Sequence, residues 1–273
     1  MSNPNAVTTF TGRIYSTDSA KADKAKGFGW LNAIMYMAPA TQGGVGNLCS
    51  HASPACIAAC LGWESGQASM VKHDSDLNSV RLSRIHKAQA FMRGRVAFMR
   101  RMAIETARVI RQAHALGMQP CIRPNGSQDV AWEGIAVDID LATAKALAKL
   151  GFDIAPGRFR HIMEVFPTTQ FVDYTKNGRR FDRALPDNYH LTFSRSETNE
   201  AQALALLSRG VNVAVVFSGP APAQWHGYTV IDGDTHDLRH LDPRGPRGFV
   251  VALSPKGRKA KRDVSGFVVR LAA

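Results

Sequence analysis

The sequence has no run of about eighteen consecutive apolar residues, which is the length that a membrane-spanning helix needs. Its first residues, MSNPNAVTTF, contain neither a basic segment nor a continuous apolar stretch of the kind that marks a secretory signal. Internal repeats and low-complexity tracts are also absent. We therefore expect neither membrane insertion nor secretion, and we expect the protein to be located in the cytoplasm.

Cysteine is scarce, with four residues in a chain of 273. Structural disulfides are rare in a reducing cytoplasm, so clustered cysteines indicate metal ligands. Three of the four, Cys49, Cys56 and Cys60, lie in one loop after the glycine-rich segment GGVGN, with the spacing C-x6-C-x3-C. Because thiolates favour iron–sulfur clusters and zinc, this loop predicts a metal centre, with an iron–sulfur cluster as the first choice. The alternative without a metal is that small buried cysteines pack in a turn.

Zinc is the other candidate metal, held by the three loop cysteines and His51 as a Cys3His set. The C-x2–4-C spacing that is usual in structural zinc sites is missing, which favours the cluster. Cys121, on a predicted strand, leaves two possibilities open. It is either the fourth thiolate of a fully ligated [4Fe–4S] cluster or a core residue, in which case one iron is open to a substrate or cofactor.

Apolar segments rich in Val, Ile and Phe predict about seven strands, at residues 31–39, 118–127, 169–176, 189–196, 211–219, 228–234 and 248–254. Such strands, with helices between them, are typical of a mostly parallel sheet covered by helices. We predict an α/β protein with a complete or partial (β/α) barrel, in which the cysteine loop follows the first core strand. Residues 1–26 are expected to be a flexible arm or edge segment, and residues 27–273 a single barrel-like domain.

Helical periodicity extends over residues 77–116, where Gly94 could divide one long helix into two. Shorter helices are predicted at residues 141–151 and 199–210, each ending at a glycine.

Polar residues follow several of the predicted strands, where the loops of a parallel barrel converge on one mouth. Asp173, Lys176 and Glu197 are the candidates for proton transfer, because charges at such a mouth need partners and often have shifted pKa values. The candidates for holding a substrate or cofactor are Asn125, Ser194, Asp232 and Asp234. Turn and helix-cap roles explain Asn125 and Ser194 equally well.

The chain is strongly basic, with a formal charge of +12 and a pI near 9.9. The excess is concentrated in a predicted helix at residues 81–111 and in a C-terminal run at residues 256–262. Such surfaces attract anionic partners, of which nucleic acid is the most common, although basic helices are often simply solvated.

Nine motifs in a fixed order resemble the bacteriophage "gene product 88" domain family. They are MYMAPA (35–40), GNLCSHASPACIAACL (46–61), the Arg81, Arg84 and Lys87 helix, RPNGSQDVAWE (123–133), DYTK (173–176), LTFS (191–194), VAVVF (213–217), VIDGDTHDLR (230–239) and SGFV (265–268). The resemblance spans nearly the whole chain and implies a phage protein in the host cytoplasm. The family has no assigned activity, so it implies no reaction.

The chain is more loosely similar to radical S-adenosylmethionine enzymes, whose partial barrels carry three cluster-binding cysteines after the first strand. The location agrees, but that superfamily typically uses C-x3-C-x2-C. This similarity implies S-adenosylmethionine as a possible cofactor beside the cluster.

We therefore expect a phage-encoded iron–sulfur protein, with a radical or Lewis-acid enzyme as one version and an unidentified small molecule or nucleic acid as its substrate. The rival is a nucleic-acid-associated binding protein with a structural iron–sulfur or zinc centre, whose basic helix and tail neutralise phosphates.

Overall fold

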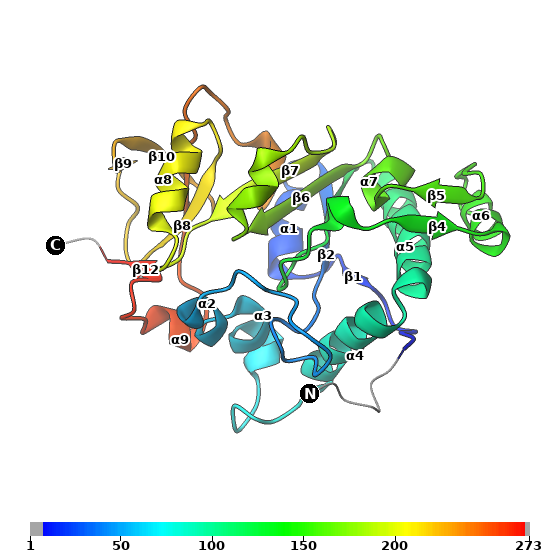
Figure 1. Cartoon of the computed structure of the whole chain (residues 1–273), viewed down its shortest axis with the longest axis horizontal. Helices are drawn as coiled ribbons and strands as arrows, with labels where there is room; N and C mark the ends of the chain where they lie inside the picture. Colours follow the sequence, from blue (N-terminus) through cyan, green and yellow to red (C-terminus); the bar gives the residue numbers. More distant parts are fainter. Residues whose placement is uncertain (1–7, 271–273) are drawn as a thin grey trace.

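A large, mostly parallel sheet organises the protein (Figure 1). The computed structural model describes residues 8–270, apart from the side chains of residues 20 and 21. Within that part of the chain, ten strands form the sheet. In spatial order they are β1 (Tyr15–Ser16), β2 (Trp30–Met35), β3 (Gln119–Arg123), β6 (Gln170–Thr175), β7 (Tyr189–Ser194), β8 (Val213–Phe217), β11 (Val250–Leu253), β10 (Tyr228–Asp232) and β9 (Gln224–Trp225), with β12 (Val268–Val269) beside β8.

The seven predicted strands are all present, as β2, β3, β6, β7, β8, β10 and β11, and they pair in parallel. Antiparallel pairing occurs at the two ends of the sheet, between β1 and β2 and between β10 and β9. In residues 8–270 no pairing joins β1 to β9, and no closed barrel is found. A separate hairpin-like pair, β4 (Val137–Ile139) and β5 (Gly157–Phe159), lies outside it.

Helices cover both faces of the sheet. On one face lie α4 (Ser79–Arg93), α5 (Arg95–Ala115), α7 (Ile162–Val165) and α8 (Glu200–Ser208), while α1 (Ala20–Lys26) and the 3-10 turn η4 (Arg239–Leu241) lie on the other. The predicted long helix is indeed divided at Gly94 into α4 and α5. The other predicted helices are α6 (Leu141–Ala148) and α8. Among the described residues, no helix has the length and apolar character needed to cross a bilayer.

The strand residues alternate between the two faces, as the pleat requires. Leu31, Ile122 and Phe171 contribute to the larger core on the α5 face. Cys121 and Val172 point to the opposite face, where they meet Ala25 of α1 and Leu238. The two faces are therefore packed as separate layers.

The N-terminal segment contributes a strand and a helix to the fold. Its residues 1–7 lie outside the described part of the chain, as do residues 271–273 at the other end. From residue 15 it forms β1, which is an edge strand as expected, and α1, which packs against β2. Ala22 and Ala25 of α1 are fully buried. Small apolar side chains at i and i+3 give this otherwise charged helix a face that fits the sheet, and the predicted flexibility of residues 1–26 stays a prediction.

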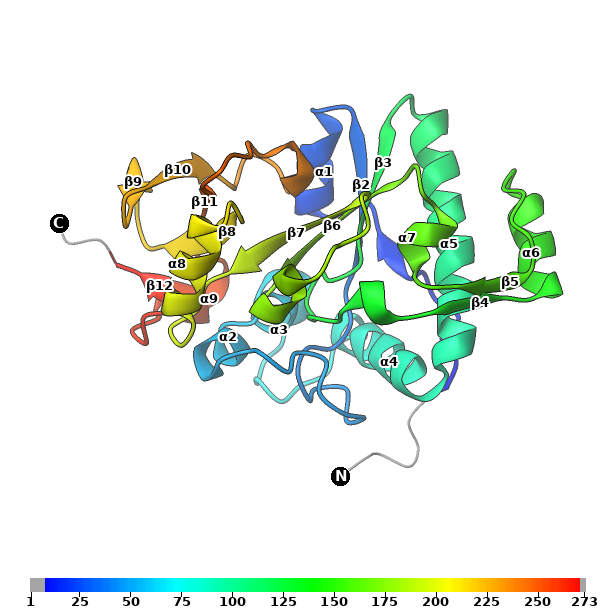
Figure 2. The same ribbon diagram turned by 45° about the horizontal axis from the view of Figure 1, so that its top comes forward.

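Strands β7 and β8 separate from each other toward the carboxyl end of β8. β7 pairs with β8 only at Phe193 and Ser194, and further along β8 its place is taken by β12, which pairs at Val216 and Phe217. Both cartoon views show α2 (Pro54–Ala58), α3 (Leu61–Glu64) and α9 (Gly257–Lys261) beside one another below this opening (Figures 1 and 2). The remaining 3-10 turns are η1 (Gly66–Ser69), η2 (Trp132–Gly134) and η3 (Gly178–Asp182).

Candidate functional site

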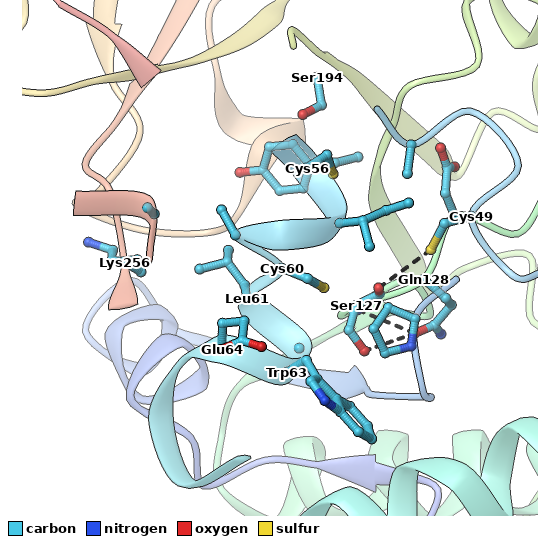
Figure 3. A pocket seen from close by; sticks show the side chains of 18 of the residues that line it. Cys49, Cys56, Cys60, Leu61, Trp63, Glu64, Ser127, Gln128, Ser194 and Lys256 are labelled. Carbon is cyan, nitrogen blue, oxygen red and sulfur yellow. Dashed lines mark hydrogen bonds between the residues drawn. The ribbon is translucent and has the colours of Figure 1, made fainter. Parts of the chain in front are cut away.

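The three loop cysteines line one cavity of about 220 Å³ at the carboxyl edge of the sheet. Figure 3 shows Cys49, Cys56 and Cys60 around the same space, with Ser194 at one end and Trp63 at the other. The wall is mainly apolar, and its apolar residues include Pro39, Ala52, Ile57, Leu61, Trp63, Val216, Leu253 and Phe267. A small, largely apolar cavity with a few convergent polar groups is the usual form of a ligand or cofactor site.

Cys49 is fixed by the backbone around it. Its own N–H donates to Asn47 Oδ1 at 2.8 Å, and its sulfur accepts the N–H of Ala40 at 3.2 Å. The sulfur also lies 3.8 Å from the carbonyl oxygen of Ser127, in the loop after β3 (Figure 3). The cysteine loop and the loop after β3 are thereby held against each other.

The short helix α2 carries Cys56 and begins at Pro54, the position where proline suits a first helical turn. Ser53 caps it, because its hydroxyl accepts the N–H of Cys56 at 3.3 Å. The same hydroxyl donates to Glu197 Oε2 at 2.7 Å, and Glu197 Oε1 accepts the N–H of Ala55 at 3.0 Å. Glu197 therefore holds the N-terminus of the cysteine helix, and its predicted role in proton transfer stays a prediction.

Cys60 lies at the junction of α2 and α3, as the residue that precedes Leu61. Close packing determines where α3 sits: a β-carbon placed on Gly62 would lie 2.1 Å from Cβ of Ser127. The guanidinium of Arg84 donates to the carbonyl of Gly62, and that of Arg81 donates to the carbonyls of Trp63 and Ala68. The segment after Cys60 is thus fixed to α4.

The three thiols influence one another. Burial raises the pKa of Cys49 to about 11 and that of Cys60 to about 12, and it also raises the pKa of Cys56. Neighbouring thiolate charge contributes to the rise for Cys60, while the cations of Lys176 and Arg84 lower the pKa of Cys56 and Cys60 respectively. The thiols therefore stay protonated at neutral pH unless a bound cation compensates their charge.

Cys121 does not line the cavity. It is fully buried on the other face of the sheet, where burial strongly raises its pKa. His51, the fourth zinc ligand considered, is exposed and shares a hydrogen bond of 2.9 Å with Ser50. Within residues 8–270, no three or more His, Cys, Asp or Glu side chains are grouped closely enough to hold a single metal ion. In a [4Fe–4S] cluster each cysteine binds a different iron, so the cysteine sulfurs need not converge as closely as around a single ion.

Four of the seven predicted strand-end residues line the cavity, namely Asn125, Lys176, Ser194 and Asp234. Lys176 donates from Nζ to Ser194 Oγ at 2.7 Å. Asp234 forms an ion pair of 3.0 Å with Lys256 and accepts the N–H of Ser254. Asp232, the exposed last residue of β10, accepts the N–H of Asp234 and the hydroxyl of Thr235, and these bonds lower its pKa.

Asn125 and Asp173 form a buried network behind the cavity. Asp173 accepts the backbone N–H of Asn125 at 2.7 Å and the hydroxyl of Tyr189 at 2.6 Å. The side chain of Asn125 is saturated, since its oxygen also accepts from Val130 and from the indole of Trp132 at 2.9 Å. Burial raises the pKa of Asp173 to about 7. This network joins β3 to β6 and β7, so Asn125 has a structural role whatever else it does.

The basic helix turns several of its charges inward. Arg81 is fully buried against backbone carbonyls, and Lys87 is largely buried, which lowers its pKa to about 8. Arg100 pairs with Asp140 at 2.7 Å. Composition could not predict this, because it does not reveal which side of a helix is covered, and nucleic-acid binding by this helix stays a prediction. Ser53 was also missed, although a serine directly before a proline and three residues before Cys56 is a cap signal.

Comparison with known proteins identifies the family of this chain. The model of the family described as gene product 88 matches residues 10–271, which is nearly the whole chain and confirms the resemblance inferred from the motifs. Neither the curated proteins nor the solved structures contain a match to this chain.

Replacing Glu197 by Gln should loosen α2. The amide has one acceptor oxygen in place of two and carries no negative charge, so it cannot accept both hydrogen bonds as the carboxylate does. We expect a loss of about 1–2 kcal/mol in local stability, and faster amide hydrogen exchange at Ala55 and Cys56. Asp153→Asn, which removes an exposed carboxylate, is the matched control. Unchanged exchange at both amides in Glu197→Gln would show that the carboxylate does not hold the helix.

Asp173 should make stability depend on pH. Its pKa rises from 3.8 to about 7 on folding, so the folded state binds the proton more tightly. The free energy of unfolding should therefore fall as the pH increases from about 4 to about 7. The groups around it are Tyr189, Arg180, Arg123 and Asn125. In Asp173→Asn this part of the dependence should vanish in urea unfolding curves, and equal pH slopes in both proteins would contradict the assignment.

Proposed function

We propose that this chain, which belongs to the gene product 88 family, is an iron–sulfur protein whose cluster is held by Cys49, Cys56 and Cys60. The observation that carries the proposal is that these three residues line one cavity. They reach it from different local structures: the loop before α2, α2 itself and the junction with α3. Such convergence is unexpected for cysteines that only fill a core.

The chemistry of the lining fits such a group. Thiolate ligands bring negative charge into a buried site, and that charge must be compensated by nearby cations. Two cations serve this purpose, since Lys176 and Arg84 act on the thiols of Cys56 and Cys60. The apolar wall limits access of water, a factor that influences the redox potential of a cluster.

Three ligands fit better than four. Cys121 lies on the opposite face of the sheet and does not line the cavity. A cluster with three protein thiolates supplies, when bound, an electron-transfer and Lewis-acid centre with one iron open to a substrate or to S-adenosylmethionine. In an enzyme of this kind, Lys176 is the predicted proton-transfer residue that lines the cavity, with Ser194 as its partner at 2.7 Å.

The strand order supports a partial (β/α) barrel as part of the same proposal. From β2 to β8 the spatial order is β2-β3-β6-β7-β8, without reversal. A doubly wound sheet reverses its order at a switch point near its middle, whereas here the order is reversed only beyond β8, where β11 precedes β10. A curved sheet of consecutive parallel strands gathers its loops at one rim, where the cysteines lie.

Anaerobic purification should yield a coloured protein with about four iron and four sulfide per chain. Alanine at Cys49, Cys56 or Cys60 should remove most of this content, because each supplies one thiolate. Cys121→Ala is the matched control and should keep it. Ultraviolet–visible and electron paramagnetic resonance spectra, with iron, sulfide and zinc quantified, provide the measurement. Colourless anaerobic material without bound metal would refute the proposal, and stoichiometric zinc without sulfide would replace the cluster with zinc.

A second candidate function is association with nucleic acid, and one observation favours it. On and beside α9, at the rim of the cavity, Arg258, Lys261 and Arg262 are exposed, and within residues 8–270 no carboxylate pairs with them. Ala260 is buried, which fixes this basic turn to the protein. In this reading the metal centre is structural, whether iron–sulfur or zinc.

Binding to a single-stranded oligonucleotide should then weaken steeply with salt. Replacing Arg258, Lys261 and Arg262 together by Gln should reduce both the affinity and the salt slope, by about one unit of slope for each lost phosphate contact. A double replacement of the exposed Lys145 and Lys149 by Gln, outside both basic segments, is the control. Negligible binding at low salt would eliminate this candidate.

A further inference from the structure

The cavity has one wall at the place where β7 and β8 separate. Lys176 follows β6, Ser194 ends β7, and Phe267 directly precedes β12. All three line the cavity. Crevices where neighbouring parallel strands part, beyond their carboxyl ends, are where α/β proteins bind their ligands.

Lys176 differs from the other charged residues of the cavity. The three carboxylates that line it already have cations: Glu64 pairs with Lys259 at 3.0 Å, Asp129 with Arg180 at 3.3 Å, and Asp234 with Lys256 at 3.0 Å. The lining residue Arg123 pairs with Asp237 at 2.6 Å. Lys176 has no carboxylate within ion-pair distance in residues 8–270.

The nearby carboxylates are not available to it. Asp129 accepts the backbone N–H of Lys176 at 2.8 Å, and its side chain also pairs with Arg180. Glu197 is engaged by Ser53 and Ala55. In the metal-free protein, whose cavity thiols are protonated, the half-buried ammonium thus carries a positive charge with neutral partners: the Ser194 hydroxyl, the Ser194 carbonyl at 3.5 Å and the ring of Phe267 at 5.5 Å.

The Lys176 ammonium and the Ser194 hydroxyl can each donate a further hydrogen bond. An ammonium has three N–H bonds, of which two are directed to Ser194. Since Ser194 Oγ accepts from Lys176, its own O–H is left to donate to a further acceptor. An oxyanion beside the pair could accept from both, with charge-assisted bonds that are stronger than neutral ones.

We propose that Lys176 and Ser194 form an anion subsite, which binds the carboxylate or phosphate group of a small molecule in the cavity. The volume of about 220 Å³ admits a ligand of only modest size. The overall charge of +12 attracts anions at long range. The subsite does not depend on the metal centre, because its donors are present on the protein alone.

The test uses inorganic phosphate and acetate as probes, with sodium chloride at matched ionic strength to remove general salt effects. Isothermal titration calorimetry and the melting temperature are measured for the full-length protein, both after removal of metal and as isolated anaerobically. Lys176→Met should weaken binding by about tenfold to a hundredfold, and Ser194→Ala should weaken it less. Lys256→Met is the matched control, since that rim lysine is already paired.

Saturable binding that is lost in Lys176→Met and kept in Lys256→Met supports the subsite. Phosphate alone, acetate alone, or both then identify the group that it accepts. The inference is overturned if neither probe binds saturably, or if Lys176→Met binds as the parent protein does, or if Lys256→Met loses as much affinity. Anion binding in metal-free protein and metal content in the cysteine variants are separate readouts, so failure of one proposal is distinguishable from failure of the other.

Discussion

The two hydrogen bonds that Glu197 accepts from the N-terminus of α2 connect the cysteine loop to the carboxyl edge of the sheet. α2 has five residues and buries none of them, so it cannot hold its own position. Its cap Ser53 binds Glu197, which follows β7, while Cys49 contacts Ser127 after β3. The relative positions of the cysteines therefore depend on strands that are distant from them in sequence.

The main elements could be predicted from the sequence because their signals are local. Runs such as VNVAVVF place apolar side chains on both faces of a strand, which indicates a buried strand. Gly94 interrupts the helical periodicity of residues 77–116 at a single point. The short elements could not be predicted. β1 and β12 have two residues each, and their conformation is determined by β2 and β8, the strands beside them. Whether the sheet closes into a barrel depends on whether its two edge strands pair, and no local sequence pattern predicts such pairing.

Some features of the candidate site could likewise be predicted from the sequence, and others could not. Three cysteines in one loop must be near one another, and this proximity was predictable. The burial of Asp173 with Tyr189, and the use of Glu197 as a helix anchor, depend on contacts between separate elements of the fold. Arg81 gave the most misleading signal, because an arginine among basic residues suggests a solvated surface. Its partners are carbonyl oxygens, which every residue has and which therefore leave no mark in a sequence.

The wall at Phe267 has a kinetic consequence. The cavity combines residues 39–64 with Phe267, so it joins segments from opposite ends of the described chain, whereas β2, β3, β6 and β7 pair in the order in which they occur. Contacts of such sequence separation form late, since the entropy of closing a long loop opposes them. We therefore expect the sheet to form before the chamber, with the thiols of the loop accessible to solvent and oxidants until β12 docks beside β8.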